Sequence, residues 1–288
     1  MKILKKSILL VFLLLYMLSC TKESNYEQED FTPKKVVLHA QIENKNRIAK
    51  NFFNEGDSIG IYIVDYVNGS PGILGSLSNS MNIIYTLEGN NAWHAADAED
   101  EIYIDNNMAD LYSYYPYDKE IGGTQNKMNL TAYPFRVGTN QNSSDKNDFL
   151  WAKYSGLSNN NNELNVIFKH ALTKVNINLS FNGMASDITN SSFKIHNLQT
   201  SSTINLRTGE VTPTGDINII KPSEKTANEN EVLYEAIIIP QALRAGTPLF
   251  SIELNDGTIL IYELENKLEF LPQKSYVFNL IVGTISRN

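Results

Sequence analysis

The sequence has one cysteine, few charged residues and a single long apolar run. Because Cys20 has no second cysteine to pair with, an internal disulfide and a cysteine-based zinc site are both excluded. Charged residues make up 19% of the chain and the net charge is −8, which disfavours binding to phosphate backbones and hence to nucleic acid. An apolar content of 42% excludes global disorder.

The apolar run is at the N-terminus and is typical of an export signal. Residues 1–6 are basic, and Ile8 to Leu18 is uninterrupted apolar sequence, which is shorter than the roughly 20 residues of a membrane-spanning helix. The run ends at Leu18-Ser19-Cys20, which resembles the lipobox of bacterial lipoproteins. The resemblance implies that residues 1–19 are removed and that Cys20 carries the lipid. An ordinary secretory peptide or a short N-terminal anchor is the alternative.

Residues 20–35 are rich in acidic side chains and poor in apolar ones, so we expect a flexible tether there. No later stretch is apolar enough to span a membrane. The N-terminal region therefore predicts a globular protein that is anchored to a membrane by lipid.

From Val36 onward the apolar residues alternate with polar ones, or form short β-branched runs closed by turn residues, which predicts an all-β chain. Tight turns such as Asn255-Asp256-Gly257 favour β-sandwich architecture. The predicted strands are 36–42, 58–67, 81–87, 101–104, 111–115, 164–168, 174–181, 193–198, 202–206, 216–220, 233–239, 249–254, 258–264 and 275–282.

An asparagine-rich segment near residues 155–162 separates two strand-rich halves of similar size. We expect a domain boundary there, with an N-terminal domain at residues 36–160 and a C-terminal domain at residues 161–288.

Five segments behind the lipobox together resemble the fimbrillin (Mfa-like, FimA-type) family of Bacteroidetes surface lipoproteins. The resemblance extends from the lipobox to the last strand, although glutamine replaces the usual glycine of the family's P-G-K-x-Y motif at position 273. The segments are FNEGDSIGIY (53–62), YYPY (114–117), DFLWA (148–152), FKHALTKV (168–175) and PQKSY (272–276).

The resemblance implies two transthyretin-like β-sandwich domains in tandem. It also implies a pilus subunit or pilus-associated component that assembles with other pilin subunits by strand exchange. Its implied location is the outer membrane, where the lipid anchors it, on the cell surface or in a fimbrium. In polymerising members, cleavage after an arginine frees the first strand, and a strand of the next subunit replaces it. Here the removable strand is Val36–Ile42, the cleavage site lies between Arg47 and Ile48, and the donor segment is Tyr276–Asn288. A solvated loop arginine is the alternative for Arg47. An anchor, a tip or a non-polymerising relative is the alternative role for the chain.

Signals of catalysis or of a cofactor are weak. The four histidines lack metal-ligand spacing, and for His170 a packing role is favoured over catalysis. Nucleophile and phosphate-binding motifs are missing, and the acidic run 97–101 lacks the spacing of a calcium loop. We therefore expect no enzyme activity, no metal and no cofactor. A hydrolase with paired carboxylates is a remaining alternative that no particular pair supports.

An aromatic cluster suggests another function, a monomeric surface lipoprotein that binds a host or bacterial polysaccharide. Stacking on a sugar requires an exposed planar row of rings, whereas tyrosines that alternate along a core strand are buried. Burial of these tyrosines in the core is favoured over sugar stacking. The cluster comprises Tyr112, Tyr114, Tyr115 and Tyr117, with Trp93 and Trp151 as further candidates.

Overall fold

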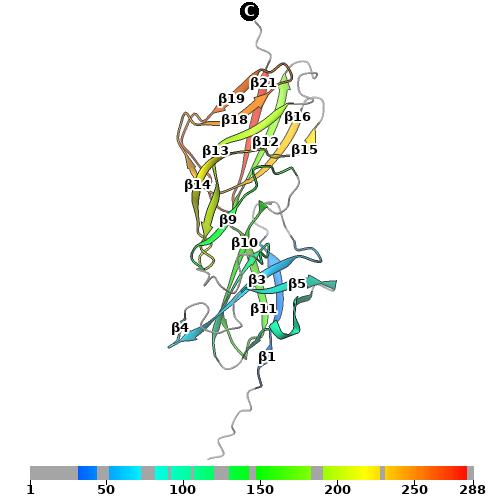
Figure 1. Ribbon diagram of the computed structural model, residues 1–288, viewed down its shortest axis with the longest axis vertical. Coiled ribbons are helices and arrows are strands. Elements are labelled where there is room, and N and C mark those ends of the chain that lie inside the picture. The colour runs from blue at the N-terminus through cyan, green and yellow to red at the C-terminus, as the bar shows by residue number, and fades with distance from the viewer. Residues whose placement is uncertain are drawn as a thin grey trace, which may run out of the picture. The chain divides into compact units, whose positions relative to one another are not determined.

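Alternating apolar residues form strands nearly everywhere in the protein, so the all-β prediction is confirmed. The computed structural model describes residues 32–43, 52–72, 82–89, 92–104, 107–119, 130–142, 147–182, 191–227 and 231–283. The 3-10 helix η2 (Ala98–Asp100) lies within these ranges. Figure 1 shows the strands in order along the chain.

Up to residue 170 the strands are β1 (Lys34–Lys35), β2 (Val37–Ile42), β3 (Ser58–Val67), β4 (Ser70–Pro71), β5 (Ile83–Glu88), β6 (Ala92–Ala95), β7 (Tyr103–Ile104), β8 (Ala109–Tyr115), β9 (Tyr133–Arg136), β10 (Leu150–Leu157) and β11 (Glu163–His170). After residue 170 they are β12 (Thr173–Asn182), β13 (Ser192–Ile204), β14 (Val211–Ile220), β15 (Ser223–Ala227), β16 (Glu231–Ile238), β17 (Ala242–Leu243), β18 (Pro248–Glu253), β19 (Ile259–Glu263), β20 (Leu268–Glu269) and β21 (Ser275–Gly283).

The first large sheet has eight strands, in the order β2-β11-β10-β8-β3-β5-β6 with β4 attached to β3. Its ends β2 and β6 lie close together, so the sheet curls towards closure. Ile59 and Ile61 of β3 belong to one cluster of buried side chains, whereas Tyr62 and Val64 belong to the other. At β3 the sheet is therefore buried on both faces, whereas β2 and β11 have one exposed face.

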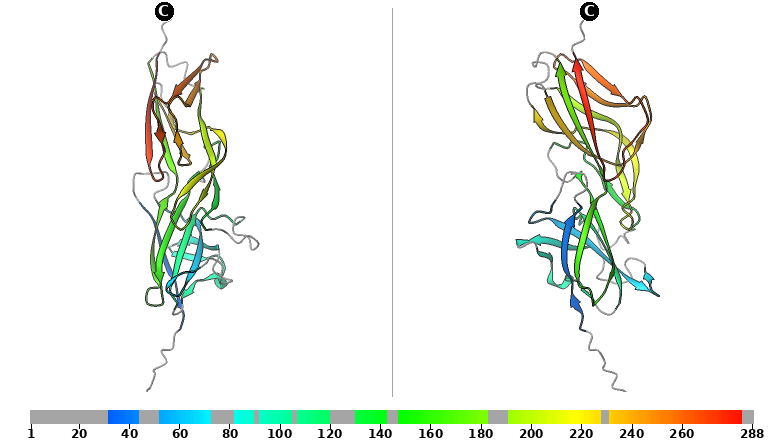
Figure 2. Two further views of the ribbon diagram at one scale, coloured as in Figure 1. Left: turned by 90° about the vertical axis from the view of Figure 1, so that its left-hand side faces the viewer. Right: turned by 180° about the vertical axis from the view of Figure 1, so that it is seen from behind.

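The later strands form two further sheets that pack on each other (Figure 2). One has the order β15-β16-β12-β21, and the other has the order β14-β13-β18-β19 with β9 attached to β13. Val175 and Ile177 of β12 share a buried cluster with Phe193 and Ile195 of β13, as expected for the core of a β-sandwich.

The turn after β13 contacts the eight-stranded sheet. Arg207 donates from Nη2 to the carbonyl oxygen of Gly72 at 3.3 Å, and its guanidinium lies 5.8 Å from the ring centre of Tyr112. Gly209, with a φ of +76°, lies so close to Trp151 that a Cβ atom would meet the indole ring at 2.0 Å. This close approach leaves no space for a larger residue at position 209.

Several local predictions differ from the structure, of which two are instructive. The segments 193–198 and 202–206 belong to one strand, β13, because irregularities in its ladder with β14 bend the strand without ending it. Asn197 is at such an irregularity and has a φ of +61°. Strand β9 was not predicted, and its second residue is Pro134, which weakens the strand pattern.

The asparagine-rich segment lies in the connection between β10 and β11, where Ser158 and Asn161 form an isolated bridge. Both strands belong to the eight-stranded sheet, so the boundary predicted after residue 160 separates two strands of one sheet. We propose that the boundary between the eight-stranded sheet and the sheets formed by the later strands falls at residues 171–172, between β11 and β12. The two-domain organisation itself stays a prediction.

Candidate strand-exchange site

Strand β2 is at the edge of the eight-stranded sheet and has one partner in it. It pairs in parallel with β11, in a register that runs from Val37 opposite Glu163 to Ile42 opposite Phe168. Two backbone bonds continue this pairing at its ends, from Val37 N to Asn162 O and from Glu43 N to Phe168 O, both 2.8 Å long. Loss of β2 would free the whole outer edge of β11.

The side chains of β2 alternate between the core and the solvent. Leu38 and Ile42 are buried, as is Val36 just before the strand, whereas Val37 is 42% exposed and His39 is exposed. Ala40, between Leu38 and Ile42, packs against the same cluster. The strand therefore fills the core with a row of small aliphatic side chains, which another strand with the same alternation could replace.

Aromatic rings from several strands share the core cluster of β2. The ring of Phe53 lies edge-on to Trp93 at 5.1 Å, to Phe168 at 5.2 Å and to Tyr115 at 5.5 Å between ring centres. Phe53 opens the FNEGDSIGIY segment, and Phe168 is the β11 residue opposite Ile42. Two of the family-like motifs therefore contribute rings to the core in which β2 packs.

A second set of contacts holds the chain just before β2. Strand β1 pairs with β7, and Val36 N donates to Ile102 O at 2.9 Å. Lys35 Nζ forms an ion pair with Glu101 Oε1 at 2.8 Å, and Lys35 O accepts a bond from Asn162 Nδ2. Lys34 and Lys35, which were expected to belong to the tether, are thus part of the folded structure.

The predicted processing and lipidation residues lie outside the described residues. Arg47 and Ile48 fall between Glu43 and Phe52, in the connection that joins β2 to β3, and Cys20 precedes the first described residue. The predicted donor segment Tyr276–Asn288 is described as far as Gly283. Its described residues belong to β21, which pairs in parallel with β12 from Lys174 opposite Ser275 to Asn182 opposite Gly283.

His170 of the FKHALTKV segment forms a buried pair with Asp148 of the DFLWA segment. His170 Nδ1 lies 2.7 Å from Asp148 Oδ2, and the two side chains are 3% and 2% exposed. The other carboxylate oxygen of Asp148 accepts a bond from the backbone N–H of Phe149. The pair is inaccessible to a substrate, and its position at the end of β11 agrees with the packing role predicted for His170.

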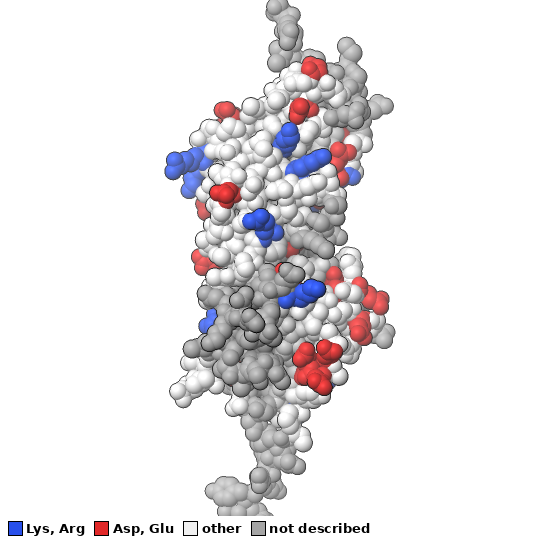
Figure 3. All heavy atoms as spheres, viewed as in Figure 1, with Lys and Arg blue, Asp and Glu red and all other residues white. Residues whose placement is uncertain are grey.

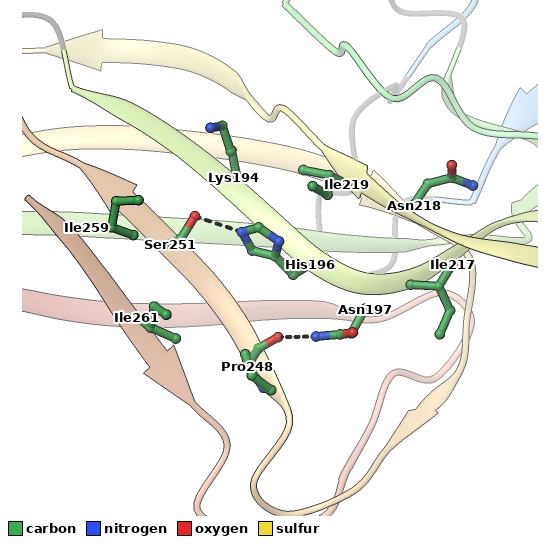
Figure 4. Close-up of a pocket in the computed structure, with 10 residues that line it drawn as sticks. All are labelled: Lys194, His196, Asn197, Ile217, Asn218, Ile219, Pro248, Ser251, Ile259 and Ile261. Atoms are coloured by element: carbon green, nitrogen blue, oxygen red, sulfur yellow. Dashed lines mark hydrogen bonds between the residues drawn. The ribbon is translucent and has the colours of Figure 1, made fainter. Parts of the chain in front are cut away.

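A second histidine lies in a shallow hollow of about 730 Å³ on the five-stranded sheet (Figure 4). His196 Nε2 and Ser251 Oγ are 2.7 Å apart, and burial lowers the pKa of His196 below its ordinary value. A nucleophilic serine also needs a group that orients the imidazole. In the described part of the chain no hydrogen bond or ion pair joins His196 to a carboxylate, so the geometry of a catalytic triad is not formed.

The aromatic residues considered for glycan stacking are mostly buried. Tyr112 and Tyr114 are at most 1% exposed, Tyr115 is 8% exposed, and Trp93 and Trp151 are 6% and 9% exposed. Burial also raises the pKa of Tyr114 to about 12. These rings form core contacts, as predicted for tyrosines that alternate along a core strand. They offer no planar platform to a sugar.

The charge distribution agrees with the acidic composition. On the face shown in Figure 3, basic side chains are scattered among neutral and acidic ones and form no broad patch within the described surface. No group of three or more His, Cys, Asp or Glu residues suitable for a metal ion was found among the described residues. No helix within the same ranges is long and apolar enough to cross a membrane.

Sequence reasoning missed the partner of β2. The partner, β11, was predicted as a strand but was assigned to the second domain, and β10, which lies beside it in the sheet, was not predicted as a strand. The only available signal was the spacing of Leu164, Val166 and Phe168, which are all fully buried. This alternation indicates a strand with one face in the core but does not identify its neighbour.

Comparisons with known proteins agree with this architecture. The sequence matches the family described as fimbrillin-like over residues 46–288. A solved candidate cell adhesion protein from Bacteroides uniformis ATCC 8492 is 22% identical, with a TM-score of 0.64 over 87% of this chain and 93% of its own. Another candidate cell adhesion protein, from Bacteroides ovatus ATCC 8483, is 17% identical, with a TM-score of 0.68 over 87% and 92%.

The tip fimbrial protein Mfa3 from Porphyromonas gingivalis is 8% identical, with a TM-score of 0.52 over 82% of this chain and 92% of its own. At these identities the solved structures show a shared fold. No curated protein matches the sequence. Because the family match covers more than half of the residues, the chain belongs to the fimbrillin-like family.

Proposed function

We propose that the protein is a lipid-anchored structural adhesion protein of the fimbrial type, which accepts a strand from a neighbouring pilin subunit in place of β2. The observation that carries this proposal is the position of β2, an edge strand with one parallel partner and a row of buried aliphatic side chains. An edge strand can leave without breaking the remaining strand ladders, whereas a central strand cannot.

The free energy that drives exchange comes from the groups that β2 leaves behind. Removal of the strand exposes the unpaired backbone groups of β11 and a slot over Phe168 and its neighbours. A donor strand restores the backbone hydrogen bonds and fills the slot with its own alternating apolar side chains. A donor that takes over the pairing of β2 unchanged runs in the same direction as β11, because β2 and β11 are parallel.

Cleavage between Arg47 and Ile48 would supply the means of removing β2. The site lies in the connection between β2 and β3, so a cut there separates β2 from the rest of the sheet while β3 keeps its pairing with β5 and β8. After the cut, only the contacts of β1 and β2 would retain the N-terminal segment. Lipid on Cys20 would then anchor that segment or, before cleavage, the whole chain.

The acceptor role has more structural support than the donor role. The predicted donor includes β21, whose pairing with β12 is continuous over nine residue pairs. Phe278, Leu280 and Val282 of β21 also pack against the core of the second part of the chain. Donation of this strand would remove all these contacts, so we favour a component that receives a strand and keeps β21 in place. Donation by Tyr276–Asn288 stays a prediction.

An Arg47→Ala variant in the native host tests the proposal. We expect sheared fimbriae of the unchanged strain to contain a chain that begins at Ile48, and cells with the variant to contain a chain that keeps residues before Arg47 and enters assemblies much less. The N-terminal sequence of the chain and its migration in unboiled and boiled detergent gels measure the two effects. A shared strand makes unfolding slow, so assemblies should resist detergent until boiled.

Lys45→Ala and Lys50→Ala are matched controls, because each removes one positive charge from the same connection and leaves Arg47 intact. Both controls should assemble as the unchanged chain does. Assembly of Arg47→Ala subunits with an intact N-terminus would contradict removal of β2 at this site.

A further inference from the structure

The outer edge of β21 is the free edge of the four-stranded sheet. Within the described residues, β21 pairs only with β12. Lys174 N donates to Lys274 O at 3.0 Å, and successive residues of a strand point their backbone groups to opposite sides. The even-numbered residues of β21 therefore face β12, and Val277, Asn279 and Ile281 direct their N–H and C=O groups outward.

This edge lacks the features that usually prevent edge pairing. Ser275–Gly283 contains no charged residue and no proline, and the side chains of Val277 and Ile281 are 59% and 69% exposed. Two other edges are protected, since β15 carries Glu224 and Lys225, and β14 contains Pro213. An exposed, uncharged edge of nine residues is a site where another strand can add.

An apolar hollow lies beside the same edge. A cavity of about 430 Å³ separates β21 from β19, and Leu280 and Val282 of β21 face Leu260 and Tyr262 of β19 across it. None of its lining residues is charged. A strand added to β21 would place its own inward side chains next to this hollow and would cover apolar surface that is exposed in the single chain.

We infer that β21 pairs with β21 of a second copy of this chain, antiparallel and centred on Asn279. In this register Asn279 lies opposite its own counterpart, and Val277 lies opposite Ile281, so the outward residues match in both size and polarity. The odd-numbered residues, whose backbone groups point away from β12, pair with one another in this register, and Ser275 lies opposite Gly283. On the inward face, Phe278 lies opposite Leu280 next to the hollow.

A second copy is favoured over an unrelated partner because the edge is complementary to itself. A two-fold axis through Asn279 gives both chains the same backbone hydrogen bonds and the same side-chain contacts. Such symmetric pairs are the commonest protein assemblies. Uncharged edges also meet without like-charge repulsion. The inference does not depend on strand exchange at β2, because it leaves β21 paired with β12 and uses only the opposite edge.

Cysteine cross-linking of the full chain in its host tests the arrangement, since directly opposed residues in an antiparallel pair lie within disulfide reach. We expect Asn279→Cys to give at least fivefold more reducible dimer under mild oxidation than the unchanged chain, in which Cys20 is the only cysteine. The single variants Val277→Cys and Ile281→Cys should each give dimer only near background. In the proposed register, each of these cysteines lies four residues, or about 13 Å, from the same cysteine of the other chain.

The Val277→Cys/Ile281→Cys double variant should cross-link as Asn279→Cys does, which gives an independent result if either single variant accumulates poorly. Adding Ile281→Lys to Asn279→Cys should abolish the dimer, because it places a charge on the edge. The inference is overturned if Asn279→Cys stays at background, if Val277→Cys alone cross-links equally well, if the lysine has no effect, or if the product contains a different protein.

Discussion

Gly60 is required by the tyrosine that covers it. A Cβ atom at position 60 would lie 2.1 Å from the Tyr114 ring and 2.6 Å from Asn82 Oδ1, and Tyr114 donates its hydroxyl hydrogen to that oxygen at 2.6 Å. Gly60 belongs to the FNEGDSIGIY segment and Tyr114 to the YYPY segment, so this contact packs the two segments against each other.

Gly60→Ala should therefore lower the free energy of unfolding by about 1–3 kcal/mol, because neither the buried ring nor the amide can move aside freely. Gly89→Ala is the matched control, because a Cβ atom there would meet nothing within 4 Å, and its effect should stay within about 0.5 kcal/mol. Denaturant unfolding of both variants measures the difference, and equal effects would contradict the packing argument.

Asp110 is a fully buried carboxylate on β8 that several donors surround. Tyr66 and Gly156 donate to Oδ1, while Tyr112 donates to Oδ2 and Lys153 Nζ lies 3.1 Å from it. Burial alone would raise the pKa of this carboxyl, but the hydrogen bonds from Lys153 and Tyr66 outweigh it and hold the pKa below its ordinary value.

A lowered pKa contributes stability that is present above the ordinary carboxyl pKa and is lost as the pH falls through the folded-state pKa. Asp110→Asn should lower the free energy of unfolding at pH 7 by about 2–3 kcal/mol and should weaken the acid dependence of stability below about pH 4. Unfolding measured from pH 7 to pH 3 tests this. Asp216→Asn, at an exposed position, should leave the profile unchanged, and an unchanged profile in Asp110→Asn would refute the assignment.

At the scale of one element, β2 has two faces with different energetic weight. Leu38 is 3% exposed and packs in the core, whereas its neighbour Val37 is 42% exposed. The two residues share the same ladder with β11, so substitutions at these positions separate core packing from backbone pairing.

Leu38→Lys should destabilise the uncleaved chain by about 3 kcal/mol or more, because it removes a core side chain and buries an unpaired charge. Val37→Lys adds the same charge on the solvent side and should change stability by less than about 0.5 kcal/mol. Thermal and denaturant unfolding measure both. Similar losses in the two variants would mean that β2 is held by its backbone ladder and not by its buried side chains.

At the scale of the whole molecule, attachment to the membrane is expected to depend on one atom, the Cys20 sulfur. Cys20→Ser should move the full-length chain from the detergent phase to the aqueous phase in phase partitioning, since lipid contributes about 0.8 kcal/mol per buried CH₂ group. Ser19→Ala keeps the thiol and should leave partitioning unchanged. Retention of Cys20→Ser in the detergent phase would instead favour an uncleaved N-terminal anchor.

Much of the fold was predictable from local patterns. The strand Ser58–Val67 was predicted with the bounds that the structure has, because alternation and flanking polar residues define it locally. The predicted domain boundary after residue 160 lies between two strands of one sheet, because polar composition marks a turn without indicating whether the adjoining strands share a sheet. Half of the candidate site was predictable from the sequence: β2 was predicted as a strand, whereas the identity of its partner in the sheet was not predicted.

By itself, the sequence determined that the chain is built of strands and which residues of each strand turn inward, because period-two alternation is a local property. The tertiary structure decided which strands are neighbours. Val37 pairs with Glu163, far along the chain, and Ser275 pairs with Lys174. Backbone hydrogen-bonding groups are the same in every residue except proline, so the choice of partner follows from how the apolar faces pack together. That packing leaves β2 and β21 at sheet edges, where strands can be exchanged or added.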